Sequence, residues 1–145
     1  MTKHTNIIAA YLALFNQGKI LLLERQNTGY HDGDFSLIAG HIDPGETFTQ
    51  GVIREAHEEA GITLQPHHLQ VAHVMHRKSA VDQTERVDVF FTATKWQGTI
   101  RNMEPQKCSQ LKWFYLDNLP DKIIPCVRKG LSNIQNKITY SEFGW

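Results

Sequence analysis

The sequence has 145 residues, which fits one domain that buries roughly two thirds of the surface of its unfolded chain. Fifteen basic and fifteen acidic residues leave no net charge, so the composition gives no reason to expect a nucleic acid or an anionic membrane as partner. The eight histidines lack zinc-binding spacing, and the two cysteines, Cys108 and Cys126, do not indicate a disulfide framework, so we expect reduced thiols in the cytoplasm.

The first part of the chain predicts two strands and a turn. Ile7–Phe15 and Ile20–Arg25 are rich in large apolar residues, and the segment between them, Asn16–Lys19, has the composition of a hairpin turn. Both runs are almost continuously apolar, which indicates strands buried on two faces. The first run is too short to span a bilayer, and it lacks a clear cleavage signal, so a signal peptide is the weaker alternative.

A polar segment, Gln26–Asp34, follows the second strand. It has glycines and no apolar periodicity, which is typical of a loop. Its position just before an acidic motif makes it a candidate substrate-binding loop, with an ordinary surface connection as the equal alternative. Phe35–Ala39 predicts a short strand that leads into Gly40.

The second half of the chain predicts three further strands. Leu69–His76 and Arg86–Trp96 have strand-like patterns, and the polar segment Arg77–Thr84 between them predicts a loop. Gln97–Lys107 is rich in turn formers, and Leu111–Leu116 predicts the last of these strands.

The C-terminal part predicts a helix and a tail. Asp117–Pro120 indicates the start of the helix, which has apolar side chains spaced to face a core at Ile123, Val127, Leu131 and Ile134. The tail, Lys137–Trp145, is expected to dock on the body or on a partner subunit through three aromatic side chains, Tyr140, Phe143 and Trp145. The sequence therefore leaves a homodimer as an alternative to a monomer.

The stretch from Gly40 to Ile62 predicts a well-specified helix. Thr47 and Gln50 form the pattern of a capping box, and Gly61 is a typical residue at the end of a helix. An apolar stripe for packing on a core runs along one side, at Phe48, Val52, Ile53, Ala56 and Ala60.

Three carboxylates share the side of this helix next to the apolar stripe. Glu55, Glu58 and Glu59 are spaced i, i+3 and i+4, so they lie within an arc of roughly 100°. Their mutual repulsion costs helix stability, and Arg54, which is four residues before Glu58, relieves only part of it. Oxygen ligands of this kind suit Mg²⁺ or Mn²⁺, which would relieve nearly all of it.

This stretch resembles the Nudix box, which runs Gly, five residues, Glu, seven residues, Arg-Glu, hydrophobic, any residue, Glu-Glu, any residue, Gly, hydrophobic. The matching positions, with the small Ala56 in the first hydrophobic slot, are Gly40, Glu46, Arg54, Glu55, Glu58, Glu59, Gly61 and Ile62. The resemblance, closest to the nucleoside triphosphate pyrophosphohydrolase-like branch, implies an α+β fold. In this fold an α/β/α sandwich surrounds a mixed sheet, as one domain over residues 1–145.

The resemblance also implies roles for the box residues. Glu55 and Glu59 would be the main metal ligands, Glu58 a third ligand or the base that activates water, and a carbonyl of Ala39 or Gly40 a further ligand. Arg54 is expected to hold Glu58 through a bidentate contact and so to support catalysis. Glu46 at the helix N-terminus and Gly61 at its end are expected to be structural.

Four residues outside the box complete the predicted site. Arg25 matches a phosphate-binding position of relatives, with a surface arginine as the alternative. Glu104 matches a distant metal-site glutamate, with a turn residue as the alternative. Phe35 and Trp113 are candidates for stacking on a base, although aromatic residues on strands more often belong to the core.

These expectations define a function. The resemblance implies Mg²⁺-dependent attack of water on a phosphorus of a nucleoside diphosphate linked to another group. The favoured substrate is a (deoxy)nucleoside triphosphate, oxidised or not, giving a monophosphate and pyrophosphate. The alternatives are ADP-ribose or another nucleoside diphosphate sugar and, in another class, a non-catalytic nucleotide-binding module. The expected partner is a small nucleotide, without nucleic acid or membrane.

Overall fold

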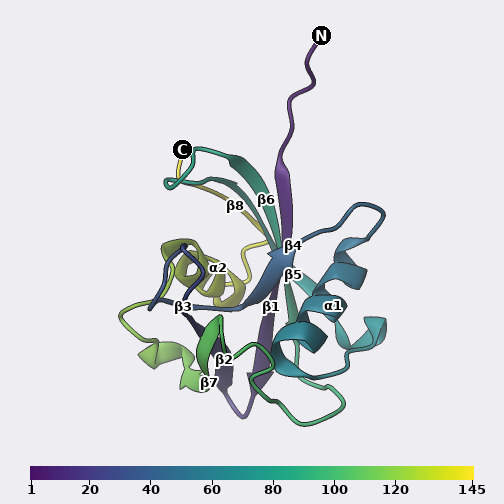
Figure 1. Cartoon of the computed structure of the whole chain (residues 1–145), viewed down its shortest axis with the longest axis vertical. Helices are drawn as coiled ribbons and strands as arrows, with labels where there is room; N and C mark the ends of the chain where they lie inside the picture. Colours follow the sequence, from purple (N-terminus) through teal and green to yellow (C-terminus); the bar gives the residue numbers. More distant parts are fainter.

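The structure is a computed structural model that describes all residues 1–145, and it shows a mixed sheet between two helices (Figure 1). The helices are α1 (Phe48–Ala60) and α2 (Pro125–Gln135). The strands are β1 (Ile7–Asn16), β2 (Lys19–Arg25), β3 (Phe35–Ser36), β4 (Ile38–His41), β5 (Gln70–Lys78), β6 (Glu85–Ala93), β7 (Cys108–Tyr115) and β8 (Tyr140–Phe143). Short 3₁₀ helices lie at Pro66–His68 and Leu116–Asn118.

Strand β1 is the centre of the sheet. It pairs antiparallel with β2 and β4 and parallel with β6. The main order is β3-β2-β1-β6-β5-β8, and β7 pairs antiparallel with β2. Strands β5 and β8 are also parallel, so the sheet is mixed as predicted.

The central strands are buried on two faces because their apolar residues alternate between two cores. Leu12 and Leu14 of β1 pack with Val52, Ala56 and Ala60 of α1. Ala13 on the opposite face of β1 packs in the second core, which also contains Val127 and Leu131 of α2. The two helices therefore cover opposite faces of the sheet, and the predicted α/β/α sandwich is confirmed (Figure 1).

Two predictions about the strands were wrong in detail. The strand expected at Phe35–Ala39 is split, because β3 pairs with β2 whereas β4 crosses to pair with β1. The loop expected at Arg77–Thr84 is shorter, because Arg77 pairs with Arg86 and Lys78 pairs with Glu85 at the end of β5.

The C-terminal helix begins later than predicted. After the 3₁₀ helix at Leu116–Asn118 the chain is not helical until Pro125, because Phe35 donates its N–H to the Lys122 carbonyl (2.7 Å) and accepts from the Ile124 N–H (3.0 Å). These bonds hold the segment extended beside β3. The tail also forms a strand that the sequence did not predict, β8, and the Trp145 indole donates to the His76 carbonyl (3.0 Å). The tail thus docks on its own body.

Both cysteines are buried and free, which agrees with the absence of a disulfide framework. No helix combines the length and the apolar character needed to cross a membrane.

The predicted caps of α1 are confirmed. The Gln50 N–H donates to Thr47 Oγ1 (3.1 Å), and the Thr47 N–H donates to Gln50 Oε1 (2.9 Å), which together form a capping box. Gly61 ends the helix at a φ of 69°, in the left-handed region that favours glycine.

Removal of the N-cap gives the first testable prediction. Thr47→Ala deletes the acceptor for the Gln50 N–H, so we expect the free energy of unfolding to fall by about 1 kcal/mol. Urea unfolding measures this loss. The control is Thr49→Ala inside the same helix, which should change stability less; an equal loss in both variants would contradict the role of the cap.

Candidate active site

An acidic pocket of about 410 Å³ brings together five of the predicted site residues, whereas Arg54, Ala39 and Gly40 do not line it. Helix α1 contributes Glu55, Glu58 and Glu59, and Arg25 comes from the end of β2. The turn before β7 adds Glu104 and Lys107 to the wall. The pocket thus has four carboxylates and two cations, from three segments that are distant in the sequence.

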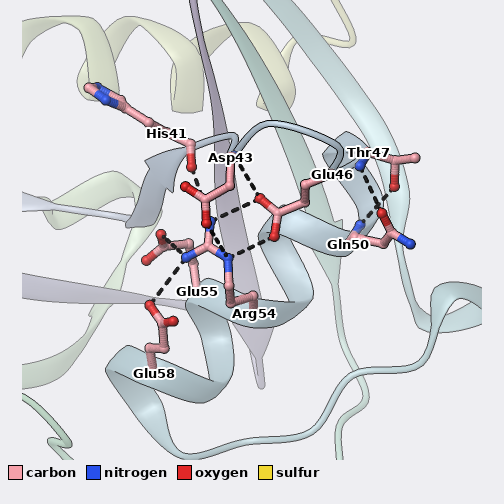
Figure 2. Close-up of polar contacts among 8 residues, drawn as sticks. All are labelled: His41, Asp43, Glu46, Thr47, Gln50, Arg54, Glu55 and Glu58. Atoms are coloured by element: carbon pink, nitrogen blue, oxygen red, sulfur yellow. Dashed lines mark hydrogen bonds and ion pairs between the residues drawn. The ribbon is translucent and has the colours of Figure 1, made fainter.

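Arg54 connects the start of the helix to this acidic face (Figure 2). Its Nε and Nη2 donate to Glu46 at 2.7 and 3.0 Å, and its Nη1 donates to Glu55 at 2.7 Å. Its contact with Glu58 is a single bond of 3.2 Å, so the prediction of a bidentate contact with Glu58 was wrong. The planar guanidinium instead pairs bidentately with Glu46 (Figure 2), which directly follows the turn at Pro44-Gly45.

Glu46 is the fixed anchor of this network. The hydrogen bonds from Arg54 lower the pKa of Glu46 to about 2, with help from the Asp43 N–H (3.0 Å). Arg54 Nη2 also donates to the His41 carbonyl (3.1 Å), which ties the helix to the end of β4. Glu46 and Arg54 thus connect the turn before α1, the helix itself and the end of β4.

Glu59 and Glu55 form the buried part of the acidic face. Burial raises the pKa of Glu59 well above its usual value, and the charge of Glu55 raises it further. Burial also raises the pKa of Glu55, although Arg54 opposes this effect. The Ala39 N–H donates to Glu59 Oε2 (3.3 Å), so the backbone of β4 meets the acidic face through its amide and not through the carbonyl that was predicted as a metal ligand. Two buried carboxylates side by side form a place where a cation would be strongly stabilised.

The donor set fits a hard divalent ion. The four glutamates of the pocket offer carboxylate oxygens, the ligands that suit Mg²⁺ or Mn²⁺. No three acidic, histidine or cysteine side chains are grouped closely enough to bind a metal as they stand, since Arg54 engages oxygens of both Glu55 and Glu58. A Cβ built on Gly40 would overlap Glu55 Oε1, so the absence of a side chain at Gly40 gives Glu55 its room.

This overlap predicts the effect of a methyl group at Gly40. In Gly40→Ala the new Cβ must displace the Glu55 carboxylate, so we expect kcat to fall by about 10-fold to 100-fold with the fold retained. Steady-state kinetics and circular dichroism measure the two properties. Thr49→Ala, in the same helix as Glu55 but outside the acidic pocket, is the control and should keep wild-type kcat. Unchanged kcat in Gly40→Ala would contradict the claim that Gly40 leaves room for the Glu55 carboxylate.

Arg25 lines the acidic pocket at the end of β2. Its Nε donates to the Tyr30 carbonyl (2.8 Å), and its Nη2 donates to Thr28 Oγ1 (3.1 Å), while its guanidinium lies over the Tyr30 ring at 5.3 Å. These contacts fix a positive charge beside the acidic pocket. The first residues of the loop, Asn27 and Thr28, also line the pocket, which favours the substrate-binding interpretation of this loop.

Glu104 lies in the same wall, and its turn is fixed by its own backbone. The Lys107 and Cys108 N–H groups both donate to the Glu104 carbonyl at 2.9 Å. The Glu104 charge contributes to the raised pKa of Glu59. Lys107 completes the wall; the sequence placed it beside Glu104 but assigned it no role of its own.

The two aromatic candidates do not reach this pocket. Phe35 is buried in the α2 core, where its ring packs edge-on against Phe114 at 5.1 Å. Trp113 lies on β7 and stacks with Trp96 at 6.2 Å. Phe35 packs in the core, and Trp113 faces a different part of the surface. Neither residue is therefore assigned to the binding of a base.

Comparison with known proteins identifies the class of this fold and site. The family model of the NUDIX domain matches residues 5–133. The chain belongs to the NUDIX family, whose members are hydrolases of pyrophosphate bonds, and the prediction of an enzyme is confirmed.

Individual relatives show how far the similarity extends. The oxidized purine nucleoside triphosphate hydrolase of Mus musculus is 31% identical over 110 residues, which span 75% of this chain and 67% of that protein. The NAD-capped RNA hydrolase NudC of Stutzerimonas stutzeri is 29% identical over 109 residues, but these span only 37% of NudC. The crystal structure of the MutT NUDIX hydrolase from Burkholderia pseudomallei superposes with a TM-score of 0.81 at 28% identity, over 89% of this chain and 98% of that one.

Proposed function

We propose that residues 1–145 act as one hydrolase domain that cleaves a nucleoside triphosphate to a monophosphate and pyrophosphate with Mg²⁺ or Mn²⁺. The observation that carries this proposal is the acidic pocket itself, where Glu55, Glu58, Glu59 and Glu104 meet Arg25 and Lys107. Similarity to the oxidized purine nucleoside triphosphate hydrolases supports a triphosphate, with an oxidised purine base as one candidate.

The charges of the pocket explain why a divalent ion belongs to the reaction. The four carboxylates outnumber the two cations, so without a metal ion the net negative charge of the pocket would repel a pyrophosphate group. We assign Glu55 and Glu59 as the main ligands, with Glu58, Glu104 and a backbone carbonyl of Ala39 or Gly40 as further candidates. The bound ion would neutralise phosphate charge and acidify a water molecule.

The protein side chains then bind and orient the reactants. Arg25 and Lys107 would hold phosphate oxygens of the substrate. Glu58 has a half-exposed side chain on the pocket wall, so it is placed to accept a proton from the attacking water. Arg54 would keep Glu55 and Glu58 on the same side of the helix, while Glu46 fixes Arg54. A cytoplasmic location and a small nucleotide as partner complete the proposal.

The test is a substrate panel. Purified protein with Mg²⁺ is incubated with the common and oxidised nucleoside triphosphates, ADP-ribose and nucleoside diphosphate sugars, and kcat/KM is measured for each. The proposal expects the highest kcat/KM among triphosphates. A preference for ADP-ribose or another diphosphate sugar would move the assignment to that branch. No turnover of any member of the panel would overturn the proposal.

A further inference from the structure

A second pocket lies on the other side of β4 from the acidic pocket. It has a volume of about 360 Å³, within the range of sites that hold small ligands. Its wall includes Tyr11 from β1, His41 from β4, Arg86 from β6 and Tyr30 from the loop after β2. None of these residues was singled out as a binding residue by the sequence.

The two pockets share one lining residue and also approach each other at Gly40. Arg25 lines both of them. Gly40 lines the second pocket, and a Cβ on it would overlap Glu55 Oε1 of the acidic pocket. Arg25 and Gly40 therefore lie where the two pockets adjoin.

The chemistry of the second pocket differs from that of the acidic pocket. Its charged lining residues are Arg25 and Arg86, and it has no carboxylate in its wall. Arg86 is largely buried and fixed, because its Nε donates to Thr84 Oγ1 (3.0 Å) and its Nη2 to Asp82 Oδ2 (3.1 Å). The charged groups here are thus donors of hydrogen bonds and never acceptors.

Two aromatic rings, those of Tyr11 and Tyr30, form part of the wall of the second pocket. Tyr11 is held by stacking on Phe90, with the ring centroids 4.7 Å apart and the planes 16° apart. The Tyr30 ring is held beside the Arg25 guanidinium. Fixed aromatic rings and two guanidinium groups suit a flat heteroaromatic ring better than a flexible or purely anionic group.

We infer that the second pocket binds the base of the nucleotide and that it selects bases that present carbonyl oxygens over bases that present an amino group. This inference rests on the proposed function, because it places the base of that substrate beside the phosphates in the acidic pocket. Arg86 is its specificity-determining residue. A carbonyl oxygen of the base accepts a hydrogen bond from the guanidinium, whereas an amino group places its own N–H donors against those of the guanidinium, so no hydrogen bond forms.

Inosine and adenosine nucleotides test this inference, since they differ mainly by a carbonyl and an amino group at one ring position. We expect kcat/KM for inosine triphosphate to exceed that for adenosine triphosphate by about tenfold or more. Arg86→Met should lower kcat/KM for the inosine nucleotide and reduce the ratio to about two, with little change for the adenosine nucleotide. Arg128→Met is the matched control, because Arg128 donates to the Pro120 carbonyl (2.8 Å) outside both pockets.

Binding measurements separate this inference from the proposed function. Calorimetry without metal compares inosine monophosphate, adenosine monophosphate and ribose 5-phosphate. We expect the inosine nucleotide to bind most tightly, and Tyr30→Leu to weaken it by about tenfold while weakening ribose 5-phosphate, which loses only the contact of the ring with Arg25, by much less. This variant keeps the Tyr30 carbonyl that holds Arg25 and is the second probe if Arg86→Met fails to fold.

The outcomes are distinct. Turnover of nucleotides with no preference between inosine and adenosine, or with a preference unchanged in Arg86→Met, would overturn the inference and leave the proposed function standing. Equal binding of ribose 5-phosphate and inosine monophosphate would also overturn it, by showing that the pocket holds phosphate. Selective binding of the inosine nucleotide without turnover of any triphosphate would support the pocket and overturn the proposed function.

Discussion

Glu59→Gln is expected to lower kcat by about 10²-fold to 10⁴-fold without loss of stability. Glu59 is the most deeply buried carboxylate of the acidic face, and burial together with the charge of Glu55 raises its pKa. Glutamine keeps the shape but not the charge that a divalent ion requires. Because the substitution also removes an unfavourable buried charge, the free energy of unfolding should stay equal to that of the wild type or rise.

Steady-state kinetics and urea unfolding on the same preparations check both halves of this prediction. The matched control is Glu142→Gln on β8, whose carboxylate accepts from the Tyr140 hydroxyl (2.9 Å) away from the acidic pocket. The control should keep wild-type kcat. Turnover by Glu59→Gln within about twofold of the wild type would remove Glu59 from the catalytic site.

Arg77→Met is expected to cost about 3 to 5 kcal/mol of the free energy of unfolding at neutral pH. Arg77 Nε donates to Asp88 Oδ2 at 2.6 Å, and the side chains are only 5% and 0% exposed. Asp88 Oδ1 is buried without a hydrogen-bond partner, so the loss of Arg77 would leave the whole carboxylate uncompensated. The double variant Arg77→Met/Asp88→Leu should recover most of the loss, because it removes both charges.

The same pair predicts a dependence on pH. Burial raises the pKa of Asp88 above its usual value even though Arg77 lowers it, and without Arg77 it should rise further. A carboxyl whose pKa is higher in the folded state than in the unfolded state loses stability as the pH rises through its folded pKa. The deficit of Arg77→Met should therefore be larger at about pH 8 than at about pH 5, as measured by urea unfolding. An equal deficit at both values would contradict an ionised, unpaired Asp88.

The fold was predictable where the sequence pattern depends on local chemistry. The continuous apolar runs at 7–15 and 20–25 predicted strands buried on two faces, and the caps Thr47 and Gly61 gave the helix its ends. Pairing between distant strands has no such local signal. The crossing of β4 to β1, the extended segment before α2 and the tail strand β8 all depend on partners far along the chain.

The candidate site shows the same division. Helical spacing placed Glu55, Glu58 and Glu59 on one face, and the structure adds Glu104 to the same pocket as expected. The bidentate partner of Arg54 was predicted incorrectly. Helical spacing pointed to Glu58, but Arg54 pairs bidentately with Glu46, which a turn outside the helix brings beside it. The second pocket had no signal in the sequence, since Tyr11, Tyr30 and Arg86 meet only through the pairing of β1 with β6 and the path of the loop.

Product analysis tests the central claim most directly. Wild-type protein is incubated with a nucleoside triphosphate and Mg²⁺, or with the metal chelated, and the products are resolved by chromatography. The account predicts equal amounts of nucleoside monophosphate and pyrophosphate with Mg²⁺ and neither product without it. Release of nucleoside diphosphate and inorganic phosphate, or turnover that persists after chelation, would contradict it.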